Sequence, residues 1–303
     1  MKLSILTATY NRAKFLEKLY NSILENLTSK LEIEWLIMDD GSEDETREVV
    51  QKFIDEQKIQ IKYMKQENQG KMVAINNLVE LATGDLIVDC DSDDYFSNNA
   101  FDIIAEEFDK TSKEGLYAIC FLKQKENGNI DGTSFKNEIS TMFDIYFKKG
   151  ATGEKSLVYY ANIRKQYKHE IENNEKFITE ARMYHKMDEK YKMKCVNKSI
   201  AVGEYQQNGY TSNILKTFTT SPYGYLKYFE EILQKDFKGV TLNKRLYAIK
   251  HYILFLTITK QKLKIRGIKN LINKILVMFL FIPGKIKTNK SFLSKDKNDI
   301  NYK

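Results

Sequence analysis

The first 122 residues alternate short apolar runs with segments of helical periodicity. Residues 2–9 form an apolar run typical of a strand, and apolar residues then recur at helical spacing through residue 27. The same criteria predict strands at 33–38, 60–64, 86–88 and 116–122, and helices at 45–55, 72–81 and 99–109. This alternation predicts an α/β fold, in which βαβ units build a mostly parallel central sheet with helices on both faces.

The pattern changes beyond residue 122. Asn-Gly at 127–128 and Asp-Gly at 131–132 predict hairpins and loops over 123–153. Residues 155–210 predict a strand, a helix over 179–190 and short strands, whereas the chain beyond Ser212 predicts basic helices. We therefore predict a main domain over 1–215, with halves at about 1–122 and 123–215, and a helical C-terminal region over 216–303.

An apolar run lies near the C-terminus, at residues 275–283 between Lys274 and Lys285. It is far shorter than the roughly 20 residues that span a bilayer. Two interpretations remain open: a helix lying on a membrane surface, or a helix packed on the rest of the protein.

The net charge of +7 conceals an asymmetry along the chain. Residues 1–100 contain 11 Lys and Arg against 19 Asp and Glu, whereas residues 211–303 contain 19 against 5. The acidic part suits a site that gathers carboxylates around a metal. The basic part suits an anionic partner such as a membrane surface, a phosphate-bearing acceptor or nucleic acid.

The cysteines and the N-terminus predict a cytoplasmic protein. The three cysteines are odd in number and lack metal-ligand spacing, as expected of unpaired thiols in a reducing compartment. The first 23 residues carry charges within an amphipathic pattern and do not match a signal peptide.

The strongest chemical signal is the acidic cluster, residues 89–94, which reads Asp-Cys-Asp-Ser-Asp-Asp after an apolar strand. Four carboxylates this close repel each other unless a cation offsets their charge, and oxygen ligands of this kind suit Mg²⁺ or Mn²⁺. A calcium loop of the EF-hand type is excluded because its sixth and twelfth positions would be Asp94 and Ala100 instead of Gly and Glu. A solvated acidic turn remains the alternative.

Two further polar signals follow predicted strands, where α/β sheets bind their ligands. Asp39-Asp40-Gly41-Ser42 offers carboxylates for a base or a ribose, with Gly41 allowing a close turn around a ligand; an acidic helix cap is the alternative. Asn68-Gln69-Gly70-Lys71 offers backbone N–H groups and a lysine for a diphosphate, although a surface turn explains it equally well.

Together with Thr7-Ala8-Thr9-Tyr10-Asn11-Arg12, these motifs resemble the family 2 glycosyltransferases in their order and spacing. The match is close over about residues 1–110 and looser to about 210. The resemblance implies the GT-A fold, a Rossmann-like architecture, with a nucleotide-sugar half at about 1–122 and an acceptor half at about 123–215. It also implies an inverting enzyme that uses a nucleotide-sugar.

The resemblance implies roles for residues around the nucleotide. Tyr10 would stack on the base with Thr9 beside it, and Asp40, helped by Asp39, would read the base, usually uracil. Lys71 takes the place of a basic residue near the nucleotide.

The resemblance implies a second set of residues around the metal and the catalytic base. Asp91 and Asp93 match the DxD pair that holds metal, ribose and diphosphate, with Ser92 between them at the nucleotide and Asp94 as an additional candidate. The general base is expected at the start of a helix in the segment 173–181. Glu180 is the first candidate and Glu175 the second, although Thr179-Glu180 departs from the more common Glu-Asp pair.

Two ring types are interpreted as structural. The chain has three histidines, His169, His185 and His251, and some enzymes of this fold add a histidine to the metal site. His185 lies off the helix face that carries Glu180, so we assign it a surface or packing role. Trp35, the single tryptophan, lies inside a predicted strand and is assigned to the core.

The predicted function is transfer of a hexosyl or N-acetylhexosaminyl group, with Mn²⁺ or Mg²⁺, from a UDP-sugar to a hydroxyl of a glycan or polyprenyl-linked oligosaccharide. Such a reaction occurs in bacterial surface polysaccharide synthesis, and the basic tail suggests contact with the inner face of the cell membrane. The alternatives are a sugar nucleotidyltransferase and a non-enzymatic protein that binds anions or nucleic acid. No nucleic-acid partner is predicted, because no reader motif is present and the acidic part would repel phosphates.

Overall fold

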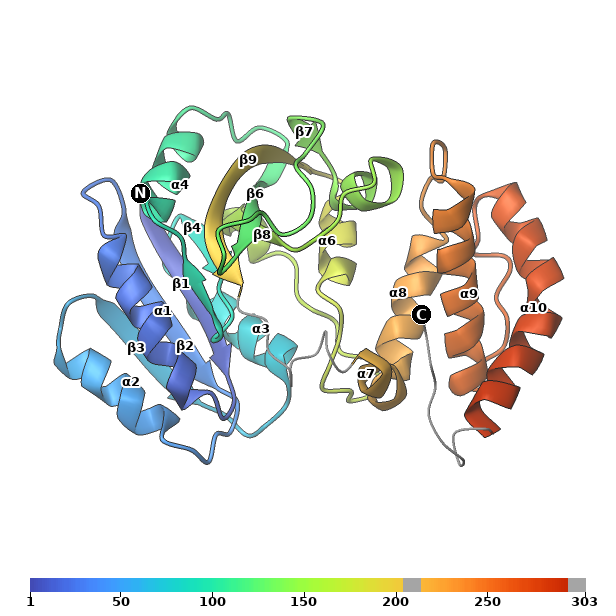
Figure 1. The fold of residues 1–303 in the computed structure, drawn as a ribbon, viewed down its shortest axis with the longest axis horizontal. Helices are drawn as coiled ribbons and strands as arrows, with labels where there is room; N and C mark the ends of the chain where they lie inside the picture. The colour runs from blue at the N-terminus through green and yellow to red at the C-terminus, as the bar shows by residue number, and fades with distance from the viewer. Residues whose placement is uncertain (204–213, 294–303) are drawn as a thin grey trace. The chain divides into compact units, whose positions relative to one another are not determined.

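The protein is represented by a computed structural model (Figure 1), which describes residues 1–203 and 214–293, with side chains over 1–203 and 216–287. The chain forms two compact units. The first contains Met1–Glu170 and Met183–Ser212, and the second contains Ile171–Arg182 and Asn213–Lys303. The structure thus groups residues 171–182 with the C-terminal helices, whereas the predicted division placed them in the main domain. The predicted boundary at 215 lies close to residues 204–213, which are outside the described residues.

The first unit is built around one mixed sheet. Its strands over the described residues are β1 (Lys2–Thr9), β2 (Glu32–Asp39), β3 (Gln60–Lys65), β4 (Leu86–Asp89), β5 (Asp94–Phe96), β6 (Leu116–Lys125), β7 (Ile139–Ser140), β8 (Lys155–Tyr160) and β9 (Lys192–Gly203). They follow the order β3-β2-β1-β4-β8-β6-β9-β5, and β7 pairs with β9.

The predicted parallel pairing is found in β3-β2-β1-β4, where all neighbours are parallel. Beyond β4 the sheet is mixed, because β8 runs antiparallel to both β4 and β6 while β6 and β9 are parallel. The short strands predicted before residue 210 are one long strand, β9. Strand β9 pairs with β6 along its length, with register shifts near Leu122, and its last residues, 201–203, also pair with β5.

The strand register aligns polar residues at one edge of the sheet. Thr9, Asp39 and Lys65 are successive register partners at the ends of β1, β2 and β3. The β4 chain leaves the sheet at Asp89, which lies opposite Leu6 of β1. Carboxyl ends of parallel strands therefore bring the three predicted polar motifs to the same edge.

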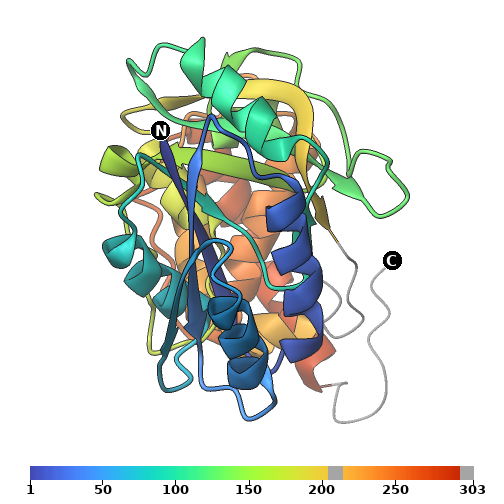
Figure 2. The same cartoon turned by 90° about the vertical axis from the view of Figure 1, so that its left-hand side faces the viewer.

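Helices cover both faces of the parallel part of the sheet. The helices that precede β9 in the chain are α1 (Ala13–Glu25), α2 (Thr46–Asp55), α3 (Lys71–Leu81), α4 (Ala100–Asp109), a π-helix (Asp144–Lys148), α5 (Ala161–Arg164) and α6 (Ala181–Met187). Figure 2 shows α1 and α2 on one side of the strands and α3 on the other. The predicted α/β fold is confirmed, while the π-helix and α5 lie in segments where no helix was predicted.

The core of the first unit confirms two structural interpretations. Trp35 is fully buried, its indole N–H donates to the Thr7 hydroxyl at 3.0 Å, and its ring lies near Tyr20 and Phe53. All three cysteines are buried free thiols, as predicted. Trp35 thus anchors β2 to α1 and α2 and has no exposed face for a sugar.

The C-terminal part of the second unit is mainly helical over the residues described. It contains α7 (Ile214–Thr220), α8 (Pro222–Ile232), α9 (Leu242–Ile258) and α10 (Leu271–Leu293), whereas residues 171–180 of the same unit form no helix or strand. Helix α9 packs against both α8 and α10. Within the described part of the chain, no helix combines the length and the apolar character needed to cross a membrane.

Candidate functional site

Asp39 holds the turn that follows β2. Its carboxylate accepts the Ser42 backbone N–H at 2.6 Å and the Tyr63 hydroxyl at 2.6 Å, and the side chain is fully buried. Gly41 has a φ of +90°, and a Cβ there would lie 3.1 Å from the backbone nitrogen of Asn68. The predicted requirement for a glycine thus arises from the close approach of two loops of the chain itself.

Asp40 binds the loop that precedes α3. One carboxylate oxygen accepts the Gln66 side-chain amide and the Gln69 backbone N–H, and the other accepts the Gly70 backbone N–H, all within 2.9 Å. The backbone N–H groups predicted to bind a diphosphate therefore bind this carboxylate. Because a carboxylate offers about four acceptor positions, about one remains for a ligand.

Thr9 and Tyr10 end β1 at the same edge of the sheet. The Thr9 side chain is buried, and its hydroxyl has no hydrogen-bond partner among the described residues. Tyr10 is 48% exposed. A buried hydroxyl without a partner costs free energy, which a bound polar ligand would offset. An exposed aromatic ring beside it offers a stacking surface.

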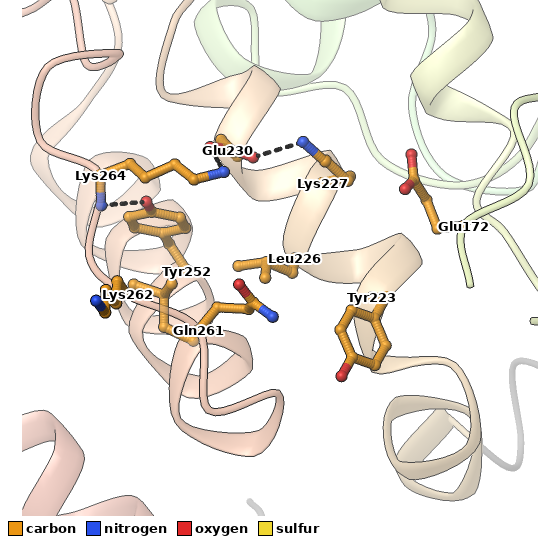
Figure 3. Close-up of a pocket in the computed structure, with 10 residues that line it drawn as sticks. Glu172, Tyr223, Leu226, Lys227, Glu230, Tyr252, Gln261, Lys262 and Lys264 are labelled. Carbon is orange, nitrogen blue, oxygen red and sulfur yellow. Dashed lines mark hydrogen bonds and ion pairs between the residues drawn. The ribbon is translucent and has the colours of Figure 1, made fainter.

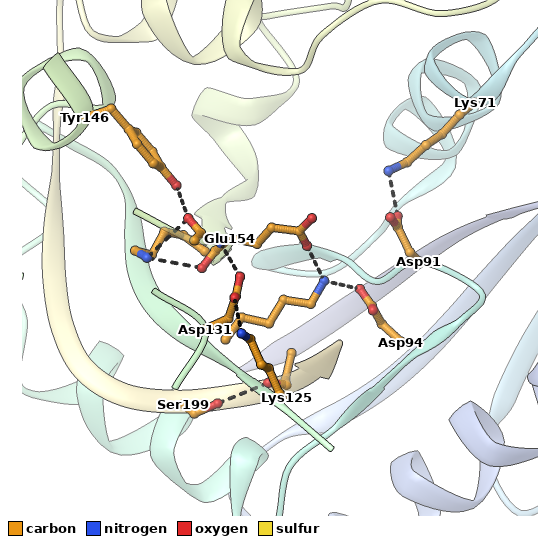
Figure 4. A network of polar contacts seen from close by, with 12 residues as sticks. Lys71, Asp91, Asp94, Lys125, Asp131, Tyr146, Glu154 and Ser199 are labelled. Carbon is orange, nitrogen blue, oxygen red and sulfur yellow. Dashed lines mark hydrogen bonds and ion pairs between the residues drawn. The ribbon is translucent and has the colours of Figure 1, made fainter. Parts of the chain in front are cut away.

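Two carboxylates of the acidic cluster form ion pairs with basic side chains. Asp91 pairs with Lys71 at 2.6 Å, and Asp93 pairs with the Arg12 guanidinium at 2.6 Å. Figure 4 shows Lys71 reaching Asp91 from α3. The Asp91 and Asp93 side chains remain 43% and 20% exposed. The repulsion predicted for these carboxylates is thus relieved by cations from α3 and from the loop after β1.

Asp94 belongs to a more buried network. The Lys123 ammonium lies 2.6 Å from Asp94 and 2.7 Å from Glu154. Burial raises the pKa of Asp94 to about 7, although Lys123 opposes the shift. For Lys123, burial alone would lower the pKa, but the two carboxylates raise it above its ordinary value. Asp94 therefore serves to join β5 to β6.

The oxygen donors of Asp91 and Asp93 fit a hard divalent cation. Among the described residues, no group of three or more His, Cys, Asp or Glu side chains converges as a complete metal site. Mg²⁺ sites of nucleotide enzymes commonly use only one or two carboxylates, and substrate phosphates supply further ligands. Two partly exposed carboxylates beside Lys71 and Arg12 thus match a metal and diphosphate together.

The chain's family follows from the motifs at this edge. The model of the family described as glycosyl transferase family 2 matches residues 4–176, more than half of the chain. The chain belongs to glycosyl transferase family 2.

Curated relatives support the same class. An uncharacterized glycosyltransferase of Mycoplasma genitalium is 37% identical over 129 residues, covering 41% of this chain and 43% of that protein. The poly(ribitol-phosphate) β-N-acetylglucosaminyltransferase TarS of Staphylococcus aureus is 28% identical over 116 residues, covering 38% of this chain and 20% of that protein. The matched stretches span less than half the length of these relatives.

Solved structures share the fold. S. aureus TarS 1–349 in complex with UDP-GlcNAc aligns with a TM-score of 0.58 at 18% identity, covering 97% of this chain and 92% of that one. A Pyrobaculum calidifontis mannosyltransferase in complex with GDP-Man and Mn²⁺ aligns with a TM-score of 0.56 at 16% identity, covering 95% and 83%. These similarities confirm the GT-A fold.

The two base candidates of this family 2 chain have different environments. Glu180 is half-buried in the turn just before α6, and its role as base stays a prediction. Glu175 is buried, and its two carboxylate oxygens accept the backbone N–H groups of Tyr223 and Gly224 at 2.8 and 2.7 Å. Those N–H groups lie in the first turn of α8, so Glu175 acts as the capping anion of that helix.

Replacing Glu175 with Gln is therefore expected to destabilise the second unit. The amide carries no charge and would turn an N–H group toward one of the two donors, so a loss of about 1–3 kcal/mol in the free energy of unfolding is expected. Urea unfolding followed by circular dichroism measures this loss. Glu114→Gln, at an exposed position, is the matched control and should leave the midpoint unchanged. An unchanged midpoint for Glu175→Gln would contradict the capping role.

The histidines have packing roles. His185 is buried and meets the edge of the Phe143 ring, which agrees with its predicted packing role. His169 lies beside the buried Arg164 guanidinium, and His251 stacks on Phe229.

Two residues of the site, Arg12 and Lys123, were not predicted from the sequence. Arg12 is part of the motif at residues 7–12, but no role was assigned to it. Its position just after the first predicted strand could have indicated that Arg12 would pair with the acidic cluster. Lys123 is a buried lysine in β6. The only sequence signal for its ion pair was its position directly after the apolar run at 116–122, where a buried lysine needs an acidic partner.

The second unit contains a pocket of about 210 Å³. Figure 3 shows Lys227 and Lys264 on two sides of Glu230, with which both form ion pairs. Tyr252 completes this wall, and its hydroxyl accepts the Lys264 backbone N–H at 3.4 Å. The pocket lining includes none of the residues that match the nucleotide-sugar motifs of the family.

Proposed function

We propose that this protein is an inverting glycosyltransferase that uses a UDP-sugar and a divalent metal. The observation that carries the proposal is the pairing of Asp91 with Lys71 and of Asp93 with Arg12. Two carboxylates and two cations at the strand ends provide ligands for a metal and for a diphosphate in one place.

Asp91 and Asp93 would hold Mn²⁺ or Mg²⁺. Bound there, the ion would offset the negative charge that develops on the leaving nucleoside diphosphate. Lys71 and Arg12 would turn from the carboxylates toward the diphosphate oxygens, because a phosphate group is a strong acceptor for both. Ser92 lies between Asp91 and Asp93 in the sequence, and its side chain is buried. It would hold the loop in place beside the ribose.

The nucleoside would bind at the ends of β1 and β2. The Tyr10 ring would stack on the base, and the buried Thr9 hydroxyl would gain the partner that it lacks. The remaining acceptor position of Asp40 suits the imide N–H of uracil, while Asp39 would act indirectly by holding the turn.

Glu180 would be the general base that takes the proton of the acceptor hydroxyl as it attacks the anomeric carbon. One base and one direct displacement invert the configuration at that carbon. The involvement of Glu175 as base is disfavoured by its bonds to α8.

The transferred group would be a hexosyl or N-acetylhexosaminyl group, and the acceptor a hydroxyl of a glycan or polyprenyl-linked oligosaccharide at the inner face of the membrane. The names of similar proteins support this choice, since TarS is a β-N-acetylglucosaminyltransferase and was solved with UDP-GlcNAc. Bacterial surface polysaccharide synthesis is the process in which such acceptors are used.

Thermal unfolding with nucleotides tests the donor site. With Mn²⁺ present, UDP is expected to raise the melting temperature more than GDP or CDP, since a ligand at 100 times its Kd stabilises by about 2.7 kcal/mol. EDTA should remove most of the UDP effect, because the diphosphate would lose the metal that links it to Asp91 and Asp93. The absence of any shift with all three nucleotides would contradict the proposed function.

A further inference from the structure

Helix α10 exposes a row of large apolar side chains. Each is at least 40% exposed, and Phe279 reaches 75%. They recur every three or four residues and so lie on one side of the helix. We call this surface the α10 stripe; it consists of Leu271, Ile272, Ile275, Met278, Phe279, Ile282 and Ile286.

The stripe is not the side by which α10 packs on its neighbour. Asn273 and Val277 are fully buried, and a Cβ added to Gly284 would lie 3.0 Å from Ile253 of α9. The Arg245 guanidinium of α9 donates to the Asn273 side-chain oxygen at 3.1 Å. Helix α10 is thus held on α9 by one face while the opposite face carries the stripe.

All charged residues in the chain around the stripe are basic. Between Asp236 and Asp296 it has no acidic residue, but it has 14 lysines and arginines. Lys285 and Lys287 are exposed on α10 itself, and Lys274 is half-buried. A large apolar surface bordered by cations is rare on a protein that stays in water and marks an interaction surface.

We infer that α10 lies in the plane of an anionic lipid surface, with the stripe among the acyl chains and the lysines at the headgroups. Helices with a wide apolar face and flanking lysines bind membranes in this way, and each lysine near the surface adds electrostatic attraction. A second copy of the chain fits less well, because two acid-free basic surfaces would repel each other. The inference rests on the proposed function only in naming the membrane as the place of the acceptor.

Vesicle sedimentation tests the inference. The full chain should bind vesicles of phosphatidylglycerol and phosphatidylcholine, and Phe279→Asp with Ile282→Asp should weaken binding by about tenfold or more, because two apolar anchors are replaced by anions. Lys285→Gln with Lys287→Gln should weaken binding to these vesicles and make it less sensitive to salt. Leu27→Asp, at an exposed leucine of the first unit, is the matched control and should bind as the unchanged protein does.

The UDP melting shift, measured on the same variants without lipid, separates this inference from the proposed function. An unchanged shift shows that the variants fold and that the nucleotide site is intact. Equal vesicle binding by the unchanged protein and by the Phe279→Asp, Ile282→Asp variant would overturn the inference. So would light scattering that finds a dimer dissociated by that variant, combined with no binding of the unchanged protein to vesicles.

Discussion

Asp93→Asn is expected to lower the rate of sugar transfer by about 10²–10³-fold, the usual cost of removing one electrostatic contact to the developing charge. The amide cannot replace the carboxylate as a ligand for a hard metal, and it also leaves Arg12 without its anionic partner. The loss should appear in kcat at saturating UDP-sugar, and the variant should require more Mn²⁺ to reach half of its own maximal rate. Release of UDP with time, at a series of Mn²⁺ concentrations, measures both effects.

Asp102→Asn is the matched control for this substitution. Asp102 pairs with Lys30 at 3.0 Å and is also partly exposed, but it lies on α4 and not in the acidic cluster. Because an exposed ion pair contributes at most about 1 kcal/mol, this variant should keep its rate and nearly all of its stability. A rate for Asp93→Asn within a factor of about three of the control would remove Asp93 from the mechanism.

Glu180→Gln is expected to reduce kcat by about 10²–10⁴-fold, the range that general-base catalysis supplies. The amide preserves the size of the side chain but cannot take the proton of the acceptor hydroxyl. Donor binding does not need this proton, so the melting shift with UDP and Mn²⁺ should be unchanged. Stopped assays with donor and acceptor measure the first quantity, and thermal unfolding measures the second.

Glu189→Gln, at an exposed glutamate just beyond α6, serves as the control for Glu180. The comparison with Glu175→Gln is also informative, because that variant should lose stability while its folded fraction retains activity. Full activity of Glu180→Gln would show that another group takes the proton. Loss of the UDP shift in Glu180→Gln would instead place Glu180 in the donor site.

Local signals were sufficient for much of the fold. The strands at 2–9, 33–38 and 60–64 and the helix at 72–81 were predicted to within two residues at each end, because buried strands and amphipathic helices carry different periods of apolar residues. Trp35 was assigned to the core for the same reason. Strand β9 was predicted as short strands, because its pairing with β6, β7 and β5 depends on segments far away in the chain.

The candidate site divides in the same way. The motifs at 39–42, 68–71 and 91–94 follow strands, so the sequence alone placed them at one edge of a parallel sheet and indicated a nucleotide and a metal. Their partners could not be predicted. Asp40 binds the backbone of Gln69 and Gly70, and Glu175 caps α8, because a carboxylate accepts whichever donors the folded chain brings within hydrogen-bond distance.

The sequence by itself therefore determined the α/β class, the order of the motifs and the chemical types at the site, since these depend on spacing and composition. Only the tertiary structure decided which cation meets each carboxylate, which glutamate is committed to a helix, and which face of α10 is left exposed. Ion pairs and apolar contacts form only between groups a few ångströms apart. The folded chain brings such groups together from positions that are tens of residues apart in the sequence.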